Sequence, residues 1–181
     1  SPLYADELAR LRATEPEPER RFEALAIPDI RAACDLFAPV FGQSGGRDGY
    51  VSLEVAPRWA DDAARTVAEA HRLAAAVARP NLLVKVPGTA AGLVAFEERT
   101  AAGVNVNVTL LFSLGQTEAA FRAWLRGLER RHAAGLPLKD SYAVASLFMS
   151  RVDTLVDAKL AALGSPEALA RAGKSAVAMG M

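Results

Sequence analysis

The sequence has one cysteine, Cys34, and two histidines among its 181 residues. A single cysteine excludes an internal disulfide bond and is typical of proteins from a reducing compartment. No spacing of histidine, cysteine and carboxylate residues suggests a metal site, so we predict that the protein binds no metal. Neither His71 nor His132 lies in a motif with a nucleophile, and a Ser/His/Asp triad therefore has little support.

The sequence also has no excess of one charge, since 21 Lys and Arg residues balance 21 Asp and Glu residues. Proteins that bind nucleic acid or acidic membranes carry basic surfaces, so we expect neither as a partner. The first residues are not a basic-then-apolar signal, and no apolar run is long enough to span a membrane. We therefore expect a cytoplasmic protein.

The pattern of apolar residues predicts four strands that alternate with four helices. The strands are expected at residues 50–55, 82–86, 104–109 and 142–146, and the helices at about residues 61–77, 90–101, 114–132 and 152–163. These spacings are typical of βαβ crossovers, so the sheet should be parallel and the fold class α/β. The length fits a single domain.

Around these four units we expect a helical segment at residues 1–49 and a helical tail at residues 165–181. In the first segment, one helix should end before an acidic, proline-containing loop at residues 15–19, and a second should begin after Pro28. The architecture is either a closed (β/α) barrel or an open doubly wound sheet. No glycine-rich nucleotide loop follows any strand, which removes the main support for a nucleotide-binding open sheet.

Lys85 is a lone cation in the apolar segment NLLVKVPGT at residues 81–89. A charged amine in a buried strand costs several kcal/mol unless it is paired or loses its proton. Desolvation lowers the pKa of a lysine, and a neutral amine can attack a carbonyl to form a Schiff base. The alternative is a lysine at a strand end whose side chain reaches solvent.

Side chains alternate between the two faces of a strand, which separates apolar from polar residues at residues 104–109. Valines occupy the even positions and should pack on helices, whereas Asn105, Asn107 and Thr109 should point into a barrel. Polar residues lie near the carboxyl end of every predicted strand, where (β/α) barrels build active sites. They are Glu54, Lys85, Asn107 with Thr109, and Ser146.

This set can perform carbonyl chemistry. Lys85 would be the nucleophile, and Glu54 would act as an acid/base through a water molecule. Asn107 and Thr109 would orient that water or hold substrate oxygens. The alternative is that Glu54 and Lys85 form only a structural ion pair.

Arg151 follows the fourth strand, at the start of a strand–helix connection. An arginine there can bind a phosphate group through its planar guanidinium, assisted by helix amides. The alternative is a surface arginine paired with Asp153 or Asp157.

Four segments resemble the transaldolases of the longer bacterial type: VSLEV (51–55), PNLLVKVPGT (80–89), GVNVNVTLLFS (103–113) and VASLFMSRVDT (144–154). The resemblance implies a (β/α) TIM-type barrel and a Schiff-base lysine at Lys85. It assigns acid/base work to Glu54, through a water held with Thr109, and active-site contacts to Asn107. The residues at the substrate end would be Ser146, Phe148 and Arg151, with Arg151 near the sugar phosphate.

Transaldolases need no cofactor. They move a dihydroxyacetone unit from a ketose phosphate (sedoheptulose 7-phosphate or fructose 6-phosphate) to an aldose phosphate (glyceraldehyde 3-phosphate or erythrose 4-phosphate) in the pentose phosphate pathway. The resemblance therefore implies sugar phosphates as the partners of this chain. The competing functions are a simple Schiff-base aldolase and an inactive, truncated relative that serves as an assembly or sugar-phosphate-binding module.

The chain departs from the family pattern at Gly88, where Ala or Ser is usual. We also expect it to lack the first two barrel strands, with a catalytic aspartate and a Thr/Ser-Asn pair, and the last two, with further phosphate ligands. Four strand–helix units are about half of the eight that a closed barrel requires. We therefore expect a partial barrel that could self-associate through two exposed edges, and proton transfer that is impaired even where imine formation survives.

Overall fold

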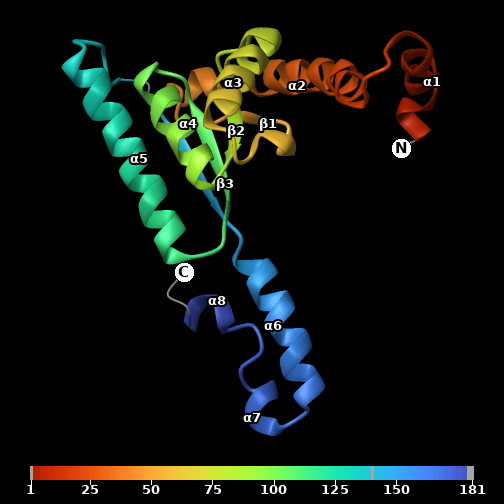
Figure 1. Ribbon diagram of the computed structural model, residues 1–181, viewed down its shortest axis with the longest axis vertical. Coiled ribbons are helices and arrows are strands. Elements are labelled where there is room, and N and C mark those ends of the chain that lie inside the picture. The colour runs from red at the N-terminus through yellow and green to blue at the C-terminus, as the bar shows by residue number, and fades with distance from the viewer. Residues whose placement is uncertain (1, 140, 179–181) are drawn as a thin grey trace.

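The computed structural model describes residues 2–139 and 141–178, which form an α/β fold (Figure 1). The strands are β1 (Val51–Glu54), β2 (Leu82–Pro87), β3 (Val106–Leu111) and β4 (Ala143–Leu147). Each strand is followed by a helix: α3 (Ala63–Val77), α4 (Ala90–Ala101), α5 (Leu114–Ala133) and α6 (Met149–Leu163). A short 3-10 turn, η2 (Pro57–Trp59), lies between β1 and α3.

The four strands form one parallel sheet in the order β1-β2-β3-β4. The alternation and the parallel pairing that the sequence predicts are therefore confirmed. Within the described residues, β1 and β4 are edge strands, and four strands are half of those in a closed (β/α) barrel. The fold is thus a partial barrel.

Helices α3, α4 and α5 cover one face of the sheet, and the apolar core lies between these helices and the sheet. Val106 and Val108 are fully buried in this core, as the alternation along β3 predicts. The opposite face carries the polar side chains, including Asn105 and Asn107, whose amides bond to other residues of that face. One face of the sheet is therefore available for packing against helices, and the other presents polar side chains.

Three of these helices begin at side chains that accept a hydrogen bond from the first turn. The caps are Asp62 for α3, Thr89 for α4 and Ser113 for α5, each bonded to the backbone N–H three residues later. Such caps fix where a helix starts, and the start of α4 agrees with the sequence prediction. The prediction for α5 differs only by one residue at its end.

The N-terminal helices differ from the expectation. They are η1 (Pro2–Tyr4), α1 (Ala5–Thr14) and α2 (Pro18–Gln43). The prediction that a helix begins after Pro28 is wrong, because α2 begins at Pro18 and continues through Pro28 and Pro39. A proline inside a helix removes one backbone hydrogen bond. Ile27, Ile30 and Cys34 on α2 pack against the core and offset that loss.

Helix α6 begins at Met149, three residues earlier than expected, and continues from β4 away from the sheet (Figure 1). It packs on two short helices, α7 (Pro166–Leu169) and α8 (Ser175–Ala178), rather than on the sheet. The expected tail at residues 165–181 is therefore helical only in part, and its residues 179–181 lie outside the described part of the chain. None of the helices described here is long and apolar enough to cross a membrane.

Candidate active site

The strand register brings Glu54, Lys85 and Asn107 into one row across the sheet. Glu54 on β1 lies opposite Lys85 on β2, and Lys85 lies opposite Asn107 on β3. One layer further on, Pro87 lies opposite Thr109. The row lies at the last residue of β1, in the second half of β2 and at the second residue of β3, and the strand ends from which α5 and α6 begin lie beyond it (Figure 1).

The Lys85 Nζ lies 3.7 Å from Oε2 of Glu54, with 26% of the lysine and 43% of the glutamate side chain exposed. The ion pair that the sequence raised as an alternative is thus present, but it is too long for a hydrogen bond. A partly exposed pair of this kind contributes little to stability. The amine remains reachable from the polar face, so the pair is compatible with chemistry at Lys85.

Asn107 is nearly buried, and its side-chain amide is hydrogen-bonded to residues on both edge strands. Its Nδ2 donates to Oγ of Ser52 on β1 at 3.2 Å, and its Oδ1 accepts from Oγ of Ser146 on β4 at 2.9 Å. The amide therefore crosses the polar face beside Lys85 and has a fixed orientation. Ser52 has no assigned role from its sequence, although its alternation with Glu54 places it on the same face.

Thr109 lies where β3 departs from regular geometry. Leu110 has a left-handed backbone with φ of +62°, and the pairing of β3 with β4 shifts between Val108 and Leu111. The backbone N–H of Gly88 donates to the Thr109 carbonyl at 2.7 Å. Thr109 is fully buried, and within residues 2–139 and 141–178 its Oγ1 has no hydrogen-bond partner. The bulge thus holds a buried hydroxyl with unused hydrogen-bonding capacity near the strand ends.

The end of β4 carries the residues expected to contact substrate. Phe148 directly precedes α6, and the guanidinium carbon of Arg151 lies 4.2 Å from the centre of the Phe148 ring. The two carboxylates expected as alternative partners of Arg151 bind backbone amides instead, Asp153 that of Ala176 and Asp157 that of Gly173. Arg151 forms no ion pair with any described residue. No hydrogen bond or ion pair in that part of the chain joins it to Lys85.

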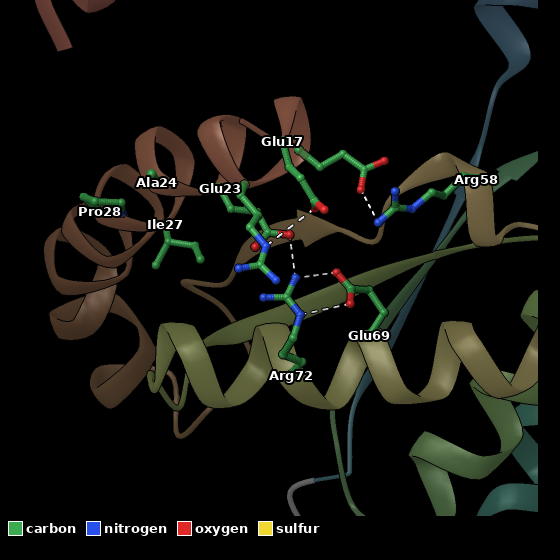
Figure 2. A pocket seen from close by; sticks show the side chains of 10 residues that line it. Glu17, Glu23, Ala24, Ile27, Pro28, Arg58, Glu69 and Arg72 are labelled. Atoms are coloured by element: carbon green, nitrogen blue, oxygen red, sulfur yellow. Dashed lines mark hydrogen bonds and ion pairs between the residues drawn. The ribbon is translucent and has the colours of Figure 1, made fainter. Parts of the chain in front are cut away.

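A cleft of about 670 Å³ lies elsewhere, between α2 and α3 (Figure 2). Its charged side chains pair with one another, since Arg72 binds Glu23 and Glu69 at 2.5 Å each and Arg58 binds Glu19. No residue predicted for catalysis lines it. A second cleft, of about 420 Å³, follows the edge strand β1 and includes Glu54.

A metal centre is not part of the described site. Among residues 2–139 and 141–178, no three His, Cys, Asp or Glu side chains lie close enough together to hold a metal ion.

The sequence pattern of one known family, described as Transaldolase/Fructose-6-phosphate aldolase, matches residues 1–179. The chain belongs to this family. Its members have the TIM-barrel type of fold, which agrees with the four parallel strand–helix units. The resemblance inferred from the four sequence segments is thereby confirmed.

Individual transaldolases are similar over nearly all of this chain. A protein named transaldolase from Thiobacillus denitrificans is 63% identical over 179 residues, which are 99% of this chain and 50% of that protein. The transaldolase of Neisseria gonorrhoeae is 47% identical over 98% of this chain and 48% of its own length. For transaldolase 1 of Streptomyces coelicolor the identity is 46%, over 97% and 46% respectively. The chain thus spans about half the length of the curated relatives it matches.

Proposed function

We propose that this chain carries the Schiff-base centre of a transaldolase, which transfers a dihydroxyacetone unit from a ketose phosphate to an aldose phosphate. The observation that carries the proposal is the position of Lys85. It lies in the second half of β2, between Glu54 and Asn107 on the neighbouring strands of the parallel sheet. Membership of the family supports the same reaction.

In the proposed first step, the free amine of Lys85 attacks the C2 carbonyl of the ketose phosphate. The carbinolamine then loses water and becomes a protonated imine. Glu54 supplies and removes the protons through a water molecule, which the Thr109 hydroxyl would also hold. The unused hydrogen-bonding capacity of Thr109 supports this role.

In the second step, the C3–C4 bond of the sugar breaks and an aldose phosphate leaves. The bonding electrons move into the imine, which becomes an enamine on Lys85, and the C4 hydroxyl passes its proton through a water molecule to Glu54, which later returns it to the aldehyde oxygen of the acceptor. The enamine then attacks the aldehyde of the acceptor, and hydrolysis of the new imine frees Lys85. Asn107 and Ser146 would hold the sugar hydroxyls, while Phe148 and Arg151 would lie at the phosphate end.

Borohydride trapping tests the imine. Incubation with fructose 6-phosphate and borohydride should leave a reduced sugar adduct on Lys85 that peptide mass spectrometry locates. Lys85→Arg should abolish labelling, whereas Lys159→Arg on the exposed surface of α6 should not. A wild-type chain that binds fructose 6-phosphate but stays unlabelled would instead be a sugar-phosphate-binding module.

A simple aldolase is the second candidate, because the family description names fructose-6-phosphate aldolase beside transaldolase. The acceptor separates the two activities. A transferase should consume fructose 6-phosphate much faster when erythrose 4-phosphate is added. An aldolase should release free dihydroxyacetone at a rate that the acceptor does not increase.

We further propose that the isolated chain self-associates, because β1 and β4 are edge strands of the described sheet. Unpaired parallel edges favour pairing with another chain. Val144 on β4 is 44% exposed, so Val144→Lys should weaken the association, while Val94→Lys on the exposed side of α4 should not. Sedimentation velocity over a concentration series measures this, and a monomer at every concentration would refute the proposal.

The pathway and the location belong to the same proposal. A transaldolase of sugar phosphates would act in the pentose phosphate pathway, in the cytoplasm. The single cysteine, Cys34, agrees with a reducing compartment. Fractionation of cells that express the tagged protein would test the location, and recovery outside the cytoplasm would contradict it.

A further inference from the structure

Two aromatic rings stack just beyond the carboxyl ends of β3 and β4, beside Arg151 in the first turn of α6. Phe112 follows β3 and Phe148 follows β4, and their ring centres lie 5.4 Å apart with 22° between the planes. Offset stacking of this kind contributes about 0.5–1.5 kcal/mol beyond the burial of apolar area. The stack joins two neighbouring strand ends.

Hydrogen bonds hold the backbone of both phenylalanines. The N–H of Phe112 donates to Oε1 of Gln116 in the first turn of α5, at 3.0 Å. The N–H of Phe148 donates to the carbonyl of Leu111, the last residue of β3, at 3.0 Å. Because each ring is attached to a held backbone, the position of Phe112 restricts the position of Phe148.

The guanidinium of Arg151 lies over the Phe148 ring, 4.2 Å from its centre. This contact orients the cation without using its N–H groups as donors to a carboxylate. Asp153 and Asp157, which follow on α6, accept hydrogen bonds from backbone amides. The guanidinium therefore keeps its planar fork for an anion.

We propose that Phe112 is a positioning residue for the phosphate end of the substrate. It fixes Phe148, which in turn holds Arg151 at the mouth of the site. Phe112 touches neither substrate nor Lys85 in this scheme. The inference rests on the proposed function, since it takes a sugar phosphate as the ligand of Arg151.

Two ligands separate this inference from the imine chemistry. Sorbitol 6-phosphate has the phosphate group but no carbonyl, so its binding does not depend on Lys85. Dihydroxyacetone has the carbonyl but no phosphate, so its trapping on Lys85 does not depend on Arg151. Phe112→Leu should weaken calorimetric binding of sorbitol 6-phosphate roughly two- to twelvefold, the loss expected for one aromatic stack. The concentration of dihydroxyacetone that gives half-maximal labelling should not change.

Matched variants give the controls. Phe112→Tyr keeps the ring and should retain binding, and Arg151→Gln should weaken it at least as much as Phe112→Leu does. Phe121→Leu changes an exposed phenylalanine on α5 outside the stack and should have no effect on either ligand. Phe112 is 37% exposed, so its replacement should lower the urea midpoint by no more than the loss of one aromatic stack.

The outcomes are distinguishable. Unchanged binding of sorbitol 6-phosphate in Phe112→Leu, or an equal loss in Phe112→Tyr, overturns the positioning role. A selective loss with no labelling of Lys85 by any carbonyl would support the positioning role and reject the proposed function. Parallel losses for sorbitol 6-phosphate and dihydroxyacetone would mean general damage to the fold and would also reject the positioning role.

Discussion

At the scale of single residues, the polar face of the sheet depends on Asn107. Its amide bonds to Ser52 and Ser146 on the two edge strands, so one side chain links three strands beside Lys85. Asn105, two residues earlier on the same face, bonds instead to Tyr50 and to the backbone of Tyr142. Two asparagines of one segment therefore have different surroundings, one beside the amine and one immediately before the start of β3.

Asn107→Leu should reduce trapping of dihydroxyacetone on Lys85 at least tenfold, because the amide beside the amine is lost. It should also lower the free energy of unfolding by about 1–3 kcal/mol, since two hydroxyls lose a partner. Asn105→Leu is the matched control and should lower stability without reducing trapping. Equal trapping by the two variants would show that Asn107 has only a structural role.

Gly88 is a second position where a single atom matters. A Cβ there would lie 2.5 Å from Cδ2 of Leu111 and 3.1 Å from the Thr109 carbonyl oxygen. Leu111 is fully buried, so its side chain has little room to move. Gly88 is thus matched to the leucine packed against it.

Gly88→Ala should therefore lower the free energy of unfolding by about 1 kcal/mol through overpacking. For a chain of this length, that corresponds to a decrease of about 2–4 °C in Tm, measured by thermal unfolding. Gly115→Ala is the control, because a Cβ at Gly115 in α5 meets nothing within 4 Å and alanine favours the helix. A Gly88→Ala variant as stable as the wild type would show that Leu111 repacks freely.

At the scale of elements, an ionic network joins α2 to α3. Arg72 on α3 binds Glu69 on its own helix and Glu23 on α2, as Figure 2 shows. The hydrogen bond from Arg72, opposed by burial, holds the pKa of Glu69 below its usual value. A carboxylate with a lowered pKa in the folded state stabilises the protein above its unfolded pKa, and that contribution disappears as the pH falls.

Glu69→Gln should therefore destabilise the chain by about 0.5–1 kcal/mol at pH 7, a value reduced for the exposure of Arg72. The difference from the wild type should begin to shrink as the pH falls below about 4.3, the ordinary pKa of a glutamate in an unfolded chain, and should be lost as the pH falls through the lower pKa of Glu69 in the folded protein. Urea midpoints at pH 7 and pH 3.5 measure both effects. Glu118→Gln, which removes an exposed pair with Arg122 on α5, should change little at either pH.

At the scale of the whole molecule, the described residues form part of a barrel. The sheet has helices on one face, an amine and polar groups on the other, and edge strands on both sides. α6 leaves the sheet, and apolar side chains of α5 such as Phe121 and Leu125 stay more than half exposed. The relatives that the chain matches are about twice as long.

Compared with the Thiobacillus denitrificans transaldolase, this chain should therefore form the imine to a similar extent but complete the transfer reaction more slowly. Lys85 should label with dihydroxyacetone to a similar extent in both, since Glu54, Asn107 and Thr109 accompany it here. Transfer from fructose 6-phosphate to erythrose 4-phosphate should be roughly hundredfold slower, the usual contribution of one general acid/base, because we expect the catalytic aspartate of the family outside the four described strands. Equal transfer rates, measured by a coupled assay at matched concentration, would show that the described strands suffice.

Much of the arrangement follows from the sequence because it depends on local periodicity. The alternation of valine and asparagine along β3 predicts which side chains enter the core and which face Lys85, and the structure agrees for Val108 and Asn107. Capping side chains such as Thr89 fix where helices begin. These features need only the neighbouring residues, so they can be derived from the order of residues alone.

The tertiary structure decided what depends on residues far apart in the chain. The pattern around Pro28 predicts a helix start, but packing of α2 on the core carries the helix through it. The left-handed Leu110 and the stack of Phe112 on Phe148 arise where two strand ends meet. The sequence by itself determined the parallel units and the polar face around Lys85, because strand periodicity is local. Only the tertiary structure decided which groups hold Asn107 and Arg151, since those contacts join separate strands.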